Sequence, residues 1–131
     1  MKRLVCVDLT SDNLQTMVEF YEQVLQIKPK WYGTGYVDFV TPVCRLSIQK
    51  PDNINFHENY SGPRIVTGGA NRSLIIVFQV DDVDAENERL MKIDGIQIVK
   101  PISTQTWNYR SVWFRDPDRN IVNFYQNLNP R

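Results

Sequence analysis

The sequence has few of the residues that enzymes use for nucleophilic or metal-dependent chemistry. His57 is the only histidine, and Cys6 and Cys44 are the only cysteines. No Ser/His/Asp set, Cys/His pair or glycine-rich phosphate loop occurs in a suitable context. Because His57 lies in a segment rich in proline and asparagine, we interpret it as a solvated or turn-stabilising residue. The sequence therefore offers few of the residues that conventional nucleophilic catalysis requires.

The chain also lacks an excess of charge and any long apolar run. Fifteen basic residues balance fifteen acidic ones, so neither a nucleic-acid partner nor an anionic membrane surface is predicted. The longest apolar runs are about five residues, too short to span a bilayer, and no signal-peptide segment follows Met1. Both cysteines lie in apolar, strand-like runs, which favours buried free thiols over a disulfide. We therefore expect a cytoplasmic protein with no membrane partner.

The chain does contain an internal repeat. Two stretches share a Val-x-Phe-x-x-Pro pattern, which begins at Val37 in the first and at Val112 in the second. Upstream of each is an apolar run that ends in an acidic residue, Asp12 or Asp82, and a helix-like segment follows each acid. A unit that recurs in fixed order indicates one supersecondary element used twice. The repeat predicts an α+β fold in which two βαβββ modules form a cupped mixed sheet around a shared cavity.

The first module is predicted to occupy residues 1–50, and a linker is predicted at 51–70. A strand is expected at Arg3–Leu9, then a helix of roughly 13 residues with cap candidates Ser11 to Asn13, which Pro29 ends. Three further strands are expected at Lys30–Tyr32, Gly35–Val40 and Cys44–Gln49. The linker is rich in proline, glycine and asparagine and is long enough to cover a pocket mouth.

The second module is predicted at 71–126 and repeats this order. A strand is expected at Leu74–Val80, followed by a helix with Asp82 as its N-cap and Gly95 as its C-cap. The next strand is expected to begin at Ile96 and to end at Pro101. A hairpin is expected last, with strands at Trp107–Arg115 and Asn120–Gln126.

Strand alternation assigns side chains to the two faces of each sheet. If Val112 and Phe114 pack against a helix, Trp113 faces the cavity, and the repeat turns Tyr36 and Asp38 the same way. The predicted ligand-binding residues on this basis are Tyr36, Asp38, Gln79, Trp113, Asn123 and Tyr125. Aromatic groups with a few polar ones suit a small organic ligand. The alternative is a closed core filled by the aromatic rings, which the cost of burying an unpaired Asp38 carboxylate opposes.

Arg110, which begins the last hairpin with Trp107, admits two interpretations. Its guanidinium can bind an anionic or carbonyl group of the ligand, and we include it in the ligand-binding set on that basis. It can instead stack on an aromatic ring and tie a loop to the sheet. We favour the second interpretation.

Three segments of the sequence resemble the vicinal oxygen chelate superfamily: FYEQVL near the start, DVDAENERLMKIDGIQIVKP and WNYRSVWFRDPDRNIVNFY. This superfamily includes glyoxalases, bleomycin-resistance proteins, extradiol dioxygenases and fosfomycin-modifying enzymes. The resemblance covers nearly the whole chain apart from Lys50–Asn71. It implies a single domain over 1–131, a small-molecule ligand and a homodimer, but it does not select one chemistry, because the scaffold hosts many.

The resemblance also implies where a metal ion would bind. In metal-dependent members, a His from the first strand and a Glu from the last strand of each half hold a divalent ion. The matching positions here are Val5, Ser47, Ile75 and Asn123, and none is a strong metal ligand. A shift of the first strand by one residue would turn Cys6, Asp8 and Thr10 toward the cavity instead, which still leaves an incomplete set. We therefore expect a member with no metal and no other cofactor.

Three functions remain as hypotheses. The first is metal-independent binding or sequestration of an aromatic or amphipathic compound. The second is a lyase, isomerase or dioxygenase with an atypical active site, in which Asp8 or Asp38 acts as general base. The third is a structural or regulatory dimer whose cavity is filled.

Overall fold

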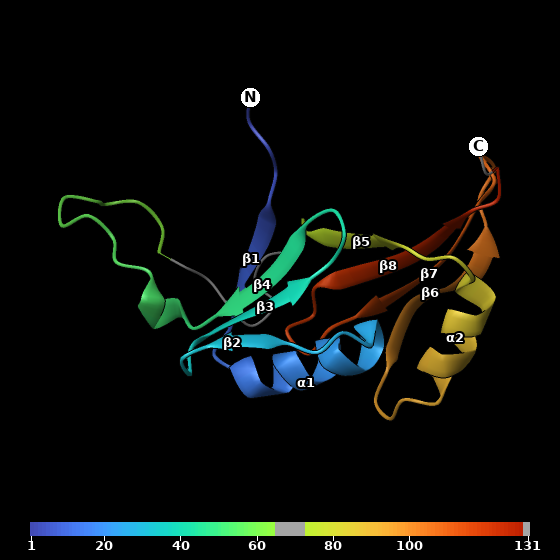
Figure 1. The fold of residues 1–131 in the computed structure, drawn as a ribbon, viewed down its shortest axis with the longest axis horizontal. Coiled ribbons are helices and arrows are strands. Elements are labelled where there is room, and N and C mark those ends of the chain that lie inside the picture. The colour runs from blue at the N-terminus through green and yellow to red at the C-terminus, as the bar shows by residue number, and fades with distance from the viewer. Residues whose placement is uncertain (65–72, 130–131) are drawn as a thin grey trace. The chain divides into compact units, whose positions relative to one another are not determined.

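The structure, a computed structural model, describes residues 1–64 and 73–129 and forms two compact units, Met1–Ala70 and Asn71–Arg131. Each unit contains an α-helix and a four-stranded mixed sheet (Figure 1). The predicted α+β class and the βαβββ repeat are therefore confirmed. The end of the predicted linker and the first residues of the predicted second module lie outside the described residues. The shared cavity and the module boundaries stay predictions.

The first unit follows the predicted order of elements. They are β1 (Cys6–Thr10), α1 (Leu14–Leu25), β2 (Lys30–Tyr32), β3 (Tyr36–Val40) and β4 (Arg45–Gln49), followed by a short 3₁₀ helix at Pro51–Asn53. The strands lie in the order β1-β4-β3-β2, with β1 parallel to β4 and the other pairs antiparallel. The chain passes from β1 to β2, at the opposite edge of the sheet, through α1, and because these two strands run in the same direction the connection crosses the sheet and places the helix on one face of it.

The second unit has the same topology. Its elements are β5 (Ile75–Gln79), α2 (Val83–Met91), β6 (Gln97–Thr104), β7 (Tyr109–Arg115) and β8 (Ile121–Asn127). The strand order is β5-β8-β7-β6, and β5 is parallel to β8. Within the described parts of the chain, no helix is long and apolar enough to cross a membrane.

The core of each unit lies between its helix and one face of its sheet. In the second unit Val112, Phe114, Val122 and Phe124 are all buried, as are Val83 and Leu90 of α2. The rings of Phe114 and Phe124 meet edge to face, with centroids 5.1 Å apart. In the first unit Tyr21 of α1 lies 6.2 Å from Phe39 of β3, measured between ring centroids. The alternation that assigned Val112 and Phe114 to the helix side is therefore confirmed.

Three details differ from the expectations. The first strand begins at Cys6, later than predicted, because its ladder with β4 starts there. Lys92 caps α2, while Gly95 lies in the turn that follows, with a φ of +79°. Strand β6 continues through Pro101, since it is an edge strand whose register shifts on both sides of Lys100. An edge strand tolerates proline because one side of it needs no backbone donor.

Candidate functional site

The side of each sheet that faces away from its helix is called here its helix-free face. In the first unit the ladders place Asp8, Ser47 and Asp38 side by side across β1, β4 and β3. Cys6 is two residues before Asp8 and shares this face, whereas Val5 precedes the strand. The register thus resolves the alternatives left open for the first strand in favour of Cys6, Asp8 and Thr10.

Asp38 is a buried carboxylate with two partners. Its residue is only 6% exposed. The Ser47 hydroxyl donates to Asp38 Oδ1 at 2.5 Å, and Arg45 Nε lies 3.6 Å from Asp38 Oδ2. A carboxylate that is hydrogen-bonded and ion-paired can remain buried at a tolerable cost. Burial of Asp38 therefore does not by itself require a ligand, contrary to the argument from an unpaired carboxylate.

Tyr36 and Asp8 form the more exposed part of this face. The Tyr36 hydroxyl donates to Asp8 Oδ1 at 3.3 Å. A hydrogen bond with Ser47 acts to lower the pKa of Tyr36. Desolvation of the hydroxyl and the negative charges of the nearby Asp8, Asp38 and Cys6 raise this pKa. Together they outweigh the effect of Ser47, so the pKa of Tyr36 lies above its usual 10.0. Tyr36 therefore stays protonated around neutral pH and can donate a hydrogen bond.

The helix-free face of the second unit carries aromatic and aliphatic side chains beside polar ones. Asn123 of β8 lies between Val77 of β5 and Trp113 of β7. The Trp113 indole Nε1 donates to the Ser111 hydroxyl at 3.1 Å. Ile75 and Val77 on the edge strand are 43% and 53% exposed. These side chains offer apolar contact area to a molecule that approaches this face.

Tyr125 extends the same face along β8. Its ring stacks on that of Tyr109 with centroids 4.8 Å apart and an interplanar angle of 20°. Its hydroxyl donates to Gln79 Oε1 at 3.4 Å. The structure therefore brings together four of the predicted residues on one sheet face: Gln79, Trp113, Asn123 and Tyr125. Tyr36 and Asp38 lie together on the equivalent face of the first unit.

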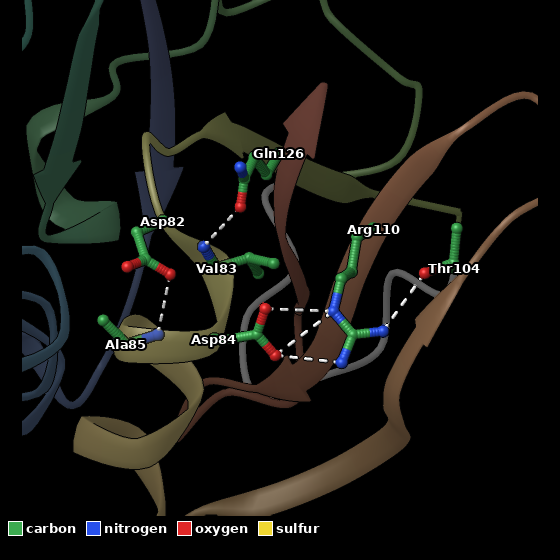
Figure 2. Close-up of polar contacts among 7 residues, drawn as sticks. All are labelled: Asp82, Val83, Asp84, Ala85, Thr104, Arg110 and Gln126. Carbon is green, nitrogen blue, oxygen red and sulfur yellow. Dashed lines mark hydrogen bonds and ion pairs between the residues drawn. The ribbon is translucent and has the colours of Figure 1, made fainter. Parts of the chain in front are cut away.

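Arg110 lies on the opposite face, toward α2. Figure 2 shows its guanidinium against Asp84, with Nε at 3.2 Å from both carboxylate oxygens and Nη2 at 2.9 Å from Oδ1. Nη1 donates to Thr104 Oγ1 at 3.1 Å. The hydrogen bond from Arg110 lowers the pKa of Asp84, and Asp84 raises that of Arg110. We therefore remove Arg110 from the candidate ligand site, and its structural partner is a carboxylate where ring stacking was expected.

The start of α2 is held by two further side chains (Figure 2). Asp82, the predicted cap, accepts a hydrogen bond from the Ala85 N–H at 3.1 Å. Gln126 of β8 accepts one from the Val83 N–H, also at 3.1 Å. The sequence indicated Asp82 by its local spacing, but no local signal pointed to Gln126, which is 43 residues from its partner.

The first unit also contains a cleft that no pattern in the sequence indicated. It has a volume of about 430 Å³ and is lined by Leu14, Gln15, Trp31, Gly33, Thr34 and Lys50. Trp31 pairs with the core residue Val37 in the β2–β3 ladder. The cleft therefore lies on the helix side of the sheet, away from Asp8 and Tyr36.

The donors on the helix-free faces do not fit the metal set of the superfamily. At the first-strand positions they are a thiol and a carboxylate in one unit, Cys6 and Asp8, and only alkyl groups in the other, Ile75 and Val77. At the last-strand positions they are a hydroxyl, Ser47, and an amide, Asn123. Among the residues that the structure describes, no three His, Cys, Asp or Glu side chains are grouped to hold an ion. Imidazole and paired carboxylates, the usual ligands of a catalytic divalent ion, are missing from these positions.

Two βαβββ units, each with a helix on one face of a four-stranded mixed sheet, have the topology of the glyoxalase/bleomycin-resistance fold. The sequence profile of the glyoxalase-like domain family matches residues 4–129, so this chain belongs to that family and to the vicinal oxygen chelate superfamily. The resemblance noted in the sequence is thus confirmed.

Individual relatives are more distant. The chain is 28% identical over 132 residues to the uncharacterized protein YraH of Bacillus subtilis (strain 168), covering 96% of this chain and 99% of YraH. A glyoxalase/bleomycin resistance protein/dioxygenase from Nocardioides has a TM-score of 0.78 at 22% identity, covering 100% of this chain and 87% of that one. A lactoylglutathione lyase from Agrobacterium tumefaciens has a TM-score of 0.73 at 22% identity, covering 96% and 94%. At 22% identity, the similarity to these two solved structures shows a shared fold and no shared activity.

Proposed function

We propose that this protein binds and sequesters a small aromatic or amphipathic molecule without a metal ion. The observation that carries the proposal is the helix-free face of the second unit, where Trp113 and Tyr125 flank the buried Asn123. Two rings and exposed aliphatic side chains supply apolar contact, and one amide supplies orientation. That combination is typical of sites for small organic ligands.

Metal independence rests on the chemistry of the donors. A thiol, a hydroxyl, an amide oxygen and the single Asp8 carboxylate, without imidazole or a second suitably placed carboxylate, hold Zn²⁺, Ni²⁺ or Mn²⁺ weakly. We expect elemental analysis of dialysed, untagged protein to give far less than one metal per chain. One metal per chain that is lost in Asn123→Ala would overturn this and bring the enzyme hypothesis to first place.

We also propose a cytoplasmic homodimer. Cys6 and Cys44 are free thiols, which suits a reducing compartment. The family resemblance favours pairing of two copies across a two-fold axis. Sedimentation at micromolar concentration tests the dimer, and a single 15.4 kDa species would contradict it.

The binding proposal is tested by native mass spectrometry of the freshly isolated protein, followed by identification of any molecule released on unfolding. The identified compound is then titrated into a variant with Trp31→Phe and Trp107→Phe, in which Trp113 is the only indole. We expect quenching of Trp113 fluorescence with the same affinity in the presence and absence of a chelator. Quenching that vanishes with chelator would contradict metal-independent binding.

A catalytic function is the second candidate, and Asp8 is the observation that favours it. Its carboxylate is exposed and accepts a hydrogen bond from Tyr36, whereas Asp38 is buried and engaged by Ser47. Asp8 is therefore the better general base of the two for a lyase, isomerase or dioxygenase reaction. If the bound compound is converted, Asp8→Asn should stop conversion while binding remains. Recovery of the unchanged compound after prolonged incubation with wild-type protein would count against catalysis.

A further inference from the structure

The amide oxygen of Asn123 is a buried acceptor without a hydrogen-bond partner. The residue is 9% exposed, and its Oδ1 atom has no donor within reach among the described residues. Such atoms are uncommon in folded proteins, because burial removes water without replacing its hydrogen bond. Within residues 1–64 and 73–129, three other buried atoms also lack a partner: Asn87 Oδ1, Ser103 Oγ and Asp118 Oδ2. Of the four, only Asn123 stands on an inner strand among the predicted ligand-binding residues.

The first unit shows how the same position can be satisfied within the chain. Ser47 occupies the position equivalent to Asn123, since each lies on the fourth strand of its unit between the first and third. Ser47 has Asp38 as its neighbour on the third strand and donates to it. In the second unit Trp113 takes the place of Asp38, and its Nε1 donates to Ser111 instead. The second unit therefore keeps a polar group at this position but supplies its Oδ1 atom with no donor.

The charged residues near Asn123 indicate whether a hydrogen-bond donor to its Oδ1 atom should be neutral or positively charged. Strands β5 to β8 contain no aspartate or glutamate. Lys100 lies opposite Trp113 across the β6–β7 ladder, and Arg115 lies opposite Ile121. Both therefore share the helix-free face with Asn123. A neutral N–H or O–H suits this face, whereas an ammonium group would meet two cations and no carboxylate from the strands of this sheet.

We propose that Asn123 Oδ1 accepts a hydrogen bond from a neutral N–H or O–H of the ligand, and that it selects aromatic compounds that carry such a donor, such as phenols and anilides. The aromatic part of the ligand lies against Trp113 and Val77, which flank the amide. This rests on the proposed binding function and adds the ligand class to it. A site built to satisfy a buried acceptor discriminates against the analogue that lacks the donor, because the acceptor then stays unpaired.

The test compares 2-naphthol with 2-methoxynaphthalene, which has the same ring system without the hydroxyl donor, by isothermal titration calorimetry. We expect wild-type protein to bind 2-naphthol at least about tenfold more tightly, the ratio that one hydrogen bond supplies. In Asn123→Leu, which has a similar volume, the ratio should fall to about one while 2-methoxynaphthalene still binds. The matched control is Asn127→Leu, on the same strand and face, whose Oδ1 already accepts from the Asn129 N–H at 2.9 Å. This control should keep the wild-type ratio.

A second readout needs no ligand. Asn123→Leu should unfold at a higher urea concentration than wild type, because it removes a buried polar atom that lacks a partner. Asn127→Leu should show no such gain. A lower urea midpoint for Asn123→Leu would mean that the amide is satisfied within the protein, and it would overturn the inference. Equal affinity of wild-type protein for the two naphthalenes would also overturn it and leave sequestration standing, whereas failure of both to bind would contradict the aromatic-ligand function itself.

Discussion

Replacing Phe114 or Phe124 with alanine should destabilise the protein by about 3–5 kcal/mol, the usual cost of deleting a fully buried ring. Phe114 is 0% exposed and Phe124 is 2% exposed, and the two rings meet at 89°. Phe124 also meets Phe78 edge to face, with centroids 5.8 Å apart. Such a contact contributes about 0.5–1.5 kcal/mol beyond the area that it buries. The loss should therefore come from both the cavity and the broken ring pair.

The measurement is urea denaturation of each variant at constant pH, with Val77→Ala as the control. Val77 is on the helix-free face of the same sheet and is half exposed, so its truncation should cost less than about 1 kcal/mol. A cycle of Phe114→Leu, Phe124→Leu and the double variant, which keeps the protein folded, should show a coupling of about 0.5–1.5 kcal/mol. A loss below about 1 kcal/mol for both alanine variants would refute the face assignment. It would also remove Trp113 and Asn123 from the candidate site.

Two further predictions follow from the pKa shifts. The hydrogen bond from Arg110 lowers the pKa of Asp84 in the folded protein below its ordinary value of 3.8. The pairing therefore stabilises the folded state above pH 3.8, and this stabilisation is lost as the pH falls through the pKa that Asp84 has in the folded protein. Urea midpoints measured across this acidic range should therefore fall less steeply in Asp84→Asn than in wild type, and equal slopes would contradict the pairing. For Tyr36, Ser47→Ala should raise the pKa further by removing a hydrogen bond that lowers it, whereas Asp8→Asn should lower it by removing a negative charge. NMR titration of ¹³C-labelled tyrosine measures both variants, and shifts in the reverse directions would refute this account of the site.

The features that local pattern determines could be predicted from the sequence. The alternation around Phe114 identified core side chains that the structure buries, and the helix expected after Ser11 to Asn13 is present as α1. These predictions succeed because a strand repeats every two residues and a helix every 3.6, whatever lies further along the chain. The repeat beginning at Val37 and Val112 indicated the two-module topology for a different reason, because a pattern that recurs in fixed order marks one supersecondary element used twice.

The features that depend on partners distant in sequence could not be predicted. The choice between Val5 and Cys6 on the first strand depends on where its ladder with β4 begins, and the passage of β6 through Pro101 depends on its place at the sheet edge. Arg110 finds its carboxylate 26 residues away. The unpaired state of Asn123 arises from the way the side chains pack around it, which the sequence does not display. The candidate site was therefore predicted as a set of faces, and its hydrogen bonds were not.

The hydrogen bonds that hold the first turn of α2 to β7 and β8 determine how the second unit unfolds locally. A helix of nine residues is too short to persist in water alone, so α2 exists only while the strands hold it. Gln126 of β8 and Arg110 of β7 attach its first turn, and Val83 and Leu90 attach its apolar face. Its amide protons should therefore exchange with solvent only when β7 and β8 separate as well, as one cooperative opening. The first turn of α1, whose Asn13 cap makes no side-chain bond, should exchange by local fraying long before its sheet opens.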